Sequence, residues 1–114
     1  MGRVAVVSTG YAREALRELG TQIKIARVDR RWTQKHLAAV IHASERTVTL
    51  IERGSPTVSV GHVFNAAVAV GVPLFEAHSP DTMMQIRTHS QEIARLIPKR
   101  VVKNAKGDNV DFDF

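Results

Sequence analysis

Residues 32–54 read WTQKHLAAVIHASERTVTLIERG, and this stretch predicts two short helices that are joined by a tight turn. Thr33 and Ser44 are suitable N-caps for the two helices, because a hydroxyl oxygen can accept a hydrogen bond from an unpaired N–H group of the first helical turn. The turn is expected at His42-Ala43. Gly54 is expected to end the second helix, since glycine readily adopts the left-handed backbone that closes many helices.

The second helix of this pair has an apolar side and a polar side. The residues of the two helices that are expected to face the core are Leu37, Ala38, Ile41, Val48 and Ile51. The side chains expected on the outer surface of the second helix are Glu45, Arg46, Thr47, Thr49 and Leu50. A short helix with such a surface fits the DNA major groove, which is about 12 Å wide. There an arginine can bind guanine through two hydrogen bonds, a glutamate can accept one from cytosine, and a leucine can meet a thymine methyl group.

Hydrophobic spacing and helix-ending residues predict further elements on both sides of this stretch. These are a helix from Tyr11 to about Arg30, a helix from the Ser59 cap to Gly71, a long helix over residues 81–97 that Pro80 precedes, a short helical turn at residues 74–77, and a small strand or ordered arm at residues 3–8. The residues from 98 to 114 are expected to be disordered, because a basic half is followed by an acidic half that contains two phenylalanines.

The charge of the chain suits a polyanionic partner. The 114 residues have a net charge of +5 and a pI near 10.2. Residues 13–53 carry nine basic side chains against five acidic ones, whereas residues 54–98 carry two against three. The positive charge is therefore concentrated around the two predicted helices. Many small proteins are basic without binding nucleic acid, so charge alone also allows an ordinary soluble protein.

Other chemistry has little support in the sequence. The chain has no cysteine, which excludes disulfides and thiolate metal sites and fits a reducing cytoplasm. The five histidines include no pair at the helical spacing that zinc hydrolases use together with a carboxylate. No glycine-rich phosphate loop or nucleophile elbow is present, so we expect no catalytic residues, no metal and no cofactor. Neither a signal peptide nor an apolar stretch near the roughly 18 residues of a membrane span is expected.

From about Leu19 to Phe75, half of the chain resembles the Cro/C1-type helix-turn-helix regulators, also called the XRE family. The residues that carry the resemblance are Thr33-Gln34, Leu37-Ala38, Ser44, Val48, Ile51-Glu52-Arg53-Gly54 and residues 67–72. The resemblance implies an all-α, five-helix, lambda-repressor-like DNA-binding domain with a C-terminal helix and a flexible tail. The expected organisation is an N-terminal arm (1–10), a helix-turn-helix DNA-binding domain (11–78), a C-terminal helix for dimerisation (79–97) and a disordered partner-binding tail (98–114).

The resemblance also assigns roles to individual residues. The base-reading positions fall on Glu45, Arg46 and Leu50, flanked by Ser44 and Thr49, and the phosphate-contacting positions are Thr33, Gln34, Thr47 and Arg53. Arg27 and Glu52 are expected to form a partly buried ion pair between the first and third helices. The chain departs from the family pattern at two positions. His42 replaces the usual turn glycine and must tolerate a positive φ angle, and Leu50 replaces a residue that is usually polar.

Repressors of this family read two half-sites about 34 Å apart, which implies a homodimer on an inverted-repeat operator in double-stranded DNA. The segment Ile97-Pro98-Lys99-Arg100-Val101 and the final Asp-Phe-Asp-Phe resemble the tails of helix-turn-helix antitoxins that are encoded beside HipA-type kinases. Phe112 and Phe114 would then anchor the tail on a HipA-like kinase toxin.

We therefore expect a cytoplasmic, sequence-specific repressor that is the antitoxin of a HipBA-like pair and represses its own operon. Two alternatives stay open at this point. A stand-alone XRE-type regulator would have no toxin partner, and its tail would be an unstructured, solubilising segment. A protein-interaction module that has lost DNA binding would show no salt-dependent affinity for DNA.

Overall fold

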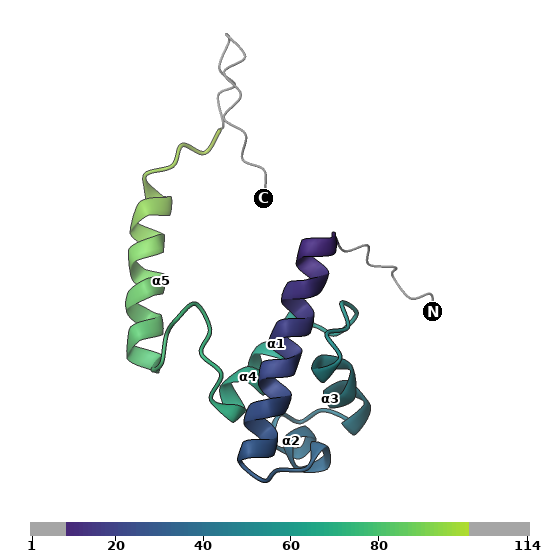
Figure 1. Ribbon diagram of the computed structural model, residues 1–114. Coiled ribbons are helices and arrows are strands. Elements are labelled where there is room, and N and C mark those ends of the chain that lie inside the picture. Colours follow the sequence, from purple (N-terminus) through teal and green to yellow (C-terminus); the bar gives the residue numbers. More distant parts are fainter. Residues whose placement is uncertain (1–8, 101–114) are drawn as a thin grey trace. The chain divides into compact units, whose positions relative to one another are not determined.

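The structure, a computed structural model, describes residues 9–100, and within this range it has five α-helices and no β-strand (Figure 1). The helices are α1 (Gly10–Asp29), α2 (Gln34–Val40), α3 (Glu45–Glu52), α4 (Val60–Val70) and α5 (Pro80–Arg95). The chain divides into two compact units, of which the first ends at His78 and contains α1 to α4, and the second begins at Ser79 and contains α5. The expectation of an all-α fold is thus confirmed for residues 9–100. The expected arm at residues 3–8 and the tail beyond residue 100 lie outside the described residues.

Every helix begins after a serine or threonine whose side-chain oxygen accepts a hydrogen bond from a backbone N–H group three residues later. These caps are Thr9, Thr33, Ser44, Ser59 and Ser79. Replacing such a cap with alanine typically costs about 1 kcal/mol. The predicted caps at Thr33, Ser44 and Ser59 are confirmed, and the boundaries of the short helices follow from them.

Left-handed backbone conformations separate the helices of the first unit. Gly54 (φ 75°) follows α3, and Gly71 (φ 82°) caps the C-terminal end of α4, as predicted. His42, in the turn between α2 and α3, has a φ angle of 55°, so it does adopt the positive φ that its position demands. This conformation costs a residue with a β-carbon roughly 1–2 kcal/mol. The contacts of the surrounding turn therefore hold His42 in a conformation that glycine would adopt without strain.

The prediction of a short helical turn at residues 74–77 was wrong. Phe75 and Glu76 have φ angles of 53° and 62°, and the N–H group of Ala77 donates to the carbonyl oxygen of Leu74 at 2.9 Å. These features describe a tight reverse turn with two left-handed central residues. Only four residues lie between Pro73 and His78, too few to offset the cost of nucleating a helix. The first unit consequently has four helices, one fewer than the resemblance implies.

The core of the first unit lies where α3 and α4 each pack against α1 and α2. The buried residues that form it are Ile23, Leu37, Ala38, Ile41, Val48, Ile51, Val63, Ala66, Ala67, Val70 and Val72. All five core residues predicted for α2 and α3 are among them. Gly20 allows α1 to approach α3 closely, because a Cβ atom there would lie 2.8 Å from the carbonyl oxygen of Glu52. Among the described residues, no helix is long and apolar enough to cross a membrane.

Candidate nucleic-acid interface

Helix α3 presents one buried side and one accessible side. Val48 is fully buried and Ile51 is 2% exposed, so these two side chains anchor the helix in the core. The exposed residues on and next to the helix are Ser44, Glu45, Arg46 and Arg53, and the half-buried ones are Thr47, Thr49 and Leu50. The expected division of α3 into an inner and an outer surface is therefore present. Its outer surface combines charged, hydroxyl and aliphatic side chains within two helical turns.

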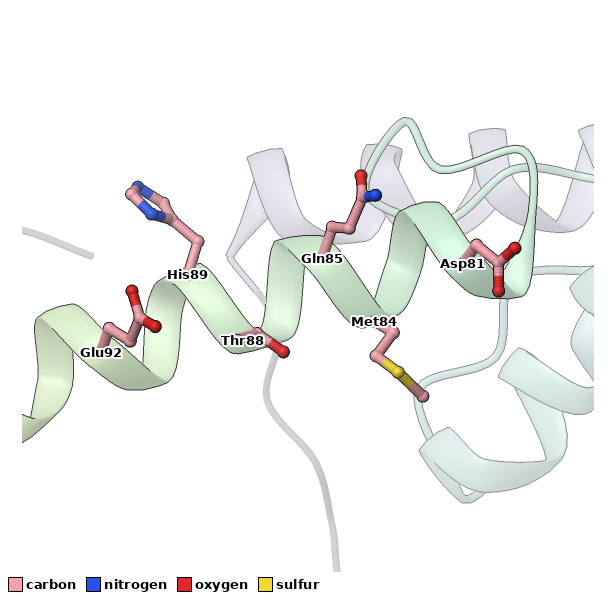
Figure 2. A pocket seen from close by; sticks show the side chains of 6 residues that line it. All are labelled: Asp81, Met84, Gln85, Thr88, His89 and Glu92. Atoms are coloured by element: carbon pink, nitrogen blue, oxygen red, sulfur yellow. The ribbon is translucent and has the colours of Figure 1, made fainter.

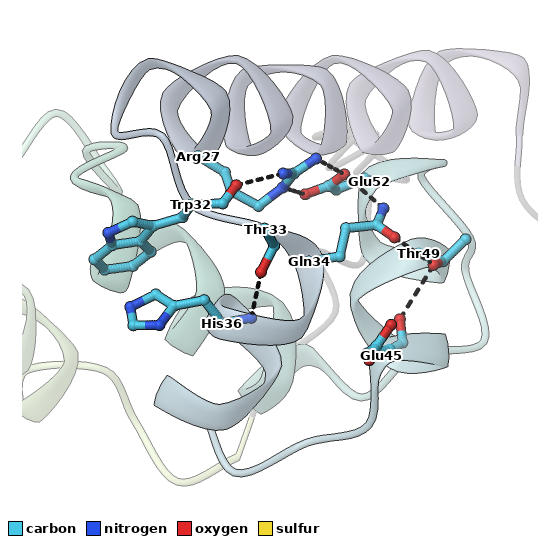
Figure 3. A network of polar contacts seen from close by, with 8 residues as sticks. All are labelled: Arg27, Trp32, Thr33, Gln34, His36, Glu45, Thr49 and Glu52. Carbon is cyan, nitrogen blue, oxygen red and sulfur yellow. Dashed lines mark hydrogen bonds and ion pairs between the residues drawn. The ribbon is translucent and has the colours of Figure 1, made fainter.

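A buried ion pair ties the C-terminal end of α3 to α1 (Figure 3). Nε of Arg27 donates to Oε2 of Glu52 at 2.6 Å, and Nη2 donates to Oε1 at 3.1 Å. The third donor, Nη1, reaches the carbonyl oxygen of Trp32 at 2.7 Å. The side chains of Arg27 and Glu52 are 10% and 3% exposed. The two residues expected to pair thus meet in a two-pronged contact that also holds the loop between α1 and α2.

Gln34 extends this network to α2 (Figure 3). Its Nε2 donates to Oε1 of Glu52 at 3.0 Å, and its Oε1 accepts a hydrogen bond from the hydroxyl of Thr49 at 3.1 Å. The same hydroxyl lies 3.1 Å from the carbonyl oxygen of Glu45. The side chains of Gln34 and Thr49, which the resemblance places at DNA, are therefore engaged inside the protein in this conformation. Their hydrogen bonds fix α2 and α3 relative to each other.

Two of the remaining hydroxyl groups of the candidate site, those of Thr33 and Ser44, serve as helix caps. Oγ1 of Thr33 accepts from the N–H group of His36 at 3.0 Å. Oγ of Ser44 accepts from the N–H group of Thr47 at 3.0 Å and lies 2.9 Å from the Thr47 hydroxyl. A hydroxyl that accepts a hydrogen bond from the backbone keeps its own O–H for another acceptor. Thr33 can therefore cap α2 and still donate to an external anion.

The cations of α3 are not neutralised by neighbouring carboxylates. The two ion pairs found between residues 9 and 100 are Arg17–Glu14 and Arg27–Glu52. Neither includes Arg46 or Arg53, and both of these side chains are exposed. An exposed guanidinium retains its planar set of donors, which matches the acceptors of guanine and the oxygens of phosphate. The accessible side of α3 is thus suited to a polyanion that also carries hydrogen-bonding groups.

A hollow lies along α5 and is open to solvent. It has a volume of about 510 Å³ and is lined by Asp81, Met84, Gln85, Thr88, His89 and Glu92. Figure 2 shows these six side chains along a single helix, and all six residues are exposed. Within the described range, no cluster of three or more histidine, aspartate or glutamate side chains could hold a metal ion. The hollow offers no buried polar group that would orient a small ligand.

Comparisons with family models, with curated proteins and with solved structures found no match for this chain. The chemistry of the candidate site must therefore be judged from its own residues. Sequence reasoning identified the accessible side of α3 but missed the hydrogen bonds that Gln34 makes to Glu52 and Thr49. In the sequence, only the polar side chains of Gln34, Thr49 and Glu52 pointed to these hydrogen bonds, and such side chains are equally compatible with a contact to DNA. Phe112 and Phe114 lie outside the described residues.

Proposed function

We propose that this chain is a sequence-specific DNA-binding transcriptional repressor in which α2 and α3 form a helix-turn-helix and α3 enters the major groove. One observation carries the proposal. A buried polar network orients α3, while the side chains of Glu45 and Arg46 point to solvent from the same helix and take no part in that network. A recognition helix needs this combination, since its inner residues must fix its direction and its outer residues must be available to bases.

The outer side chains supply complementary contacts to base edges. Arg46 would donate two hydrogen bonds to guanine, Glu45 would accept one from the amino group of cytosine, and the half-buried Leu50 would contact a thymine methyl group. A good bidentate contact discriminates against a wrong base by about 1–3 kcal/mol. Ser44 and Thr49 flank this set. The hydroxyl of Thr49 could reach a base only by giving up its hydrogen bond to Gln34.

Phosphate contacts would surround this reading surface. Arg53 at the C-terminal end of α3 is an exposed cation, and Thr33 and Thr47 have hydroxyls near the start of α2 and α3. Gln34 is the weakest of the expected phosphate ligands, because its amide would have to leave Glu52 and Thr49 before it could bind. We therefore assign phosphate binding mainly to Arg53, Thr33 and Thr47.

The wider proposal concerns partners. A homodimer would bind an inverted repeat in double-stranded DNA, with one copy on each half-site. Within this proposal the protein is cytoplasmic and is the antitoxin of a HipBA-like pair, and its tail engages a HipA-like kinase. Removing residues 101–114 tests the tail directly. The truncated chain should lose binding to the kinase encoded beside it and keep DNA binding, whereas a stand-alone regulator would have no such kinase partner.

The experiment that tests DNA reading is a fluorescence-anisotropy titration with DNA from upstream of the protein's own gene and with a scrambled duplex, at several salt concentrations. Wild type should bind its own upstream DNA with a steep salt dependence. Arg46→Ala should lose about 5- to 150-fold in affinity for that DNA and much less for the scrambled duplex. Arg13→Ala removes the same charge from an exposed site in the first turn of α1 and is the matched control.

The outcomes separate the alternatives. If Arg46→Ala and Arg13→Ala weaken binding to both duplexes by the same factor, Arg46 acts only as a charge, and the assignment of base reading is wrong. If wild type binds neither duplex at low salt, the repressor proposal fails. The protein-interaction module would then be the better explanation of the fold.

A further inference from the structure

Within the first unit, an apolar surface of α4 has no partner. Val60, Phe64 and Val68 follow one another at four-residue spacing on the same face of the helix and are 66%, 37% and 68% exposed. Phe75, 67% exposed, places its ring edge-on to that of Phe64 with the ring centroids 6.3 Å apart. We call these four side chains the α4 stripe. The opposite face of α4 is buried in the core, so this helix is apolar on both sides. A helix of that kind usually has a partner on each side.

The α4 stripe also lies in the uncharged part of the first unit. Helix α4, VGHVFNAAVAV, has no charged residue, and Glu76 is the single charged residue between residues 54 and 78. Residues 13–53, in contrast, carry nine basic side chains against five acidic ones. Two copies of this chain would repel each other wherever their basic surfaces met. The α4 stripe is a surface on which two positively charged copies can meet without that repulsion.

We propose that the α4 stripe is the contact between two copies of this chain, packed about a two-fold axis with stripe against stripe. The proposal rests on the homodimer of the proposed function and assigns it an interface on α4, in place of the C-terminal helix α5 that the sequence analysis expects to dimerise. In a symmetric dimer the same patch faces itself and must be complementary to itself, and an apolar patch with little charge meets that condition. A second copy brings a ridge of the same shape and polarity, and side chains four residues apart form the ridges by which helices commonly pack.

The size of the stripe indicates a weak dimer. An exposed patch of this kind covers on the order of 400 Å², at the level of the largest apolar patches on ordinary monomers. Two such patches together bury about 800 Å², below the roughly 1,200 Å² at which stable interfaces begin. We therefore expect a reversible monomer–dimer equilibrium in solution. Adjacent half-sites on DNA would hold two copies at an effective concentration of about 1 mM, so the same contact would make DNA binding cooperative.

The test is sedimentation velocity of the full chain without DNA over about 1–100 μM. Wild type should shift from monomer to dimer within that range. Val68→Glu should raise the dimer dissociation constant at least about tenfold, because each copy would place an unpaired carboxylate in an apolar contact. Val68 is 68% exposed, so the variant is expected to fold, and circular dichroism checks this. The controls are Tyr11→Glu on α1 and Ile93→Glu on α5, at residues 90% and 53% exposed.

A second measurement does not depend on charge. The chain has no cysteine, so single cysteines at Val60, Phe64 and Val68 can be compared with one at Tyr11 under mild oxidation. A position near the two-fold axis should form a disulfide-linked dimer much faster than the Tyr11 control, since the bond needs Cα atoms within about 7 Å.

Three results would overturn the proposal. The first is a wild type that stays monomeric up to 100 μM. The second is a dimer that Ile93→Glu dissociates and Val68→Glu does not, which would assign the contact to α5. The third is a set of stripe cysteines that cross-link no faster than the control. A monomeric wild type that still reads its upstream DNA through Arg46 would leave the proposed function intact and remove only this interface.

Discussion

Replacing Glu52 with leucine should destabilise the first unit severely. The carboxylate of Glu52 accepts two hydrogen bonds from Arg27 and one from Gln34, and its side chain is 3% exposed. Leucine would fill similar space but would leave the guanidinium buried, with the carbonyl oxygen of Trp32 as its remaining acceptor in the network. Breaking one side of a buried pair in this way costs about 3–5 kcal/mol.

That loss is large compared with the stability available. A unit of about 70 residues, at roughly 0.05–0.15 kcal/mol per residue, has about 4–10 kcal/mol in total. The double variant Arg27→Met/Glu52→Leu removes both charges and should recover most of the loss, because an apolar pair of similar volume often matches a buried ion pair. It should stay within about 2 kcal/mol of wild type, since the Trp32 carbonyl and the Gln34 amide each lose one partner.

Urea denaturation measures these differences. The chain has a single tryptophan, Trp32, in the loop between α1 and α2, and its ring centroid lies 4.6 Å from that of His36, so its emission reports the packing of this loop against α2. Far-UV circular dichroism provides the independent probe of helix content. The reasoning is refuted if Glu52→Leu lowers the free energy of unfolding by less than about 1 kcal/mol. It is also refuted if the double variant loses as much as the sum of the losses in Arg27→Met and Glu52→Leu.

Three further predictions concern single positions. Gly20→Ala should lower the free energy of unfolding in urea by about 1–3 kcal/mol, because the new methyl group meets the main chain of α3. Gly61→Ala is the control and should raise it by about 0.5–1 kcal/mol, because no atom lies within 4 Å of the added Cβ. Equal effects would contradict the close approach of α1 and α3. His42→Gly should raise the free energy of unfolding by about 0.5–1 kcal/mol, because glycine adopts the positive φ angle without strain. Ala39→Gly, at an exposed position of α2, should lower it by about 1 kcal/mol. A lower value for both variants would contradict strain at the turn. If α3 binds DNA as proposed, Arg53→Ala should weaken binding to all sequences about equally and lower the slope of log affinity against log salt by about 1, and an unchanged slope would exclude Arg53 as a phosphate contact.

Local chemistry explains why the helices were predictable from the sequence. A serine or threonine cap and a left-handed glycine act within one helical turn, so the start of α2 at Thr33 and the end of α4 at Gly71 are encoded by neighbouring residues. The buried side of α3 was equally accessible, because Val48 and Ile51 stand at helical spacing. These features require no knowledge of what the rest of the chain does.

Contacts between distant residues explain what the sequence did not reveal. The partners of Gln34 are 15 and 18 residues away, and no local rule distinguishes an amide that faces solvent from one that bridges two helices. The turn at Phe75 and Glu76 was missed for a related reason. Neither residue type favours a positive φ, so the conformation is imposed by the packing of Leu74 and Ala77 on either side. The accessible side of α3 was identified, but which of its side chains are engaged inside the protein was not.

The residues that orient α3 and the residues that face outward from it are different. Arg27, Glu52 and Gln34 hold the helix, and substitutions at the exposed Glu45 and Arg46 should change the free energy of folding by no more than about 0.5 kcal/mol. Mutations at these two positions can therefore accumulate without selection against misfolding. Lineages that share this scaffold can diverge in what they bind, and a randomised library at positions 45 and 46 would consist almost entirely of folded members.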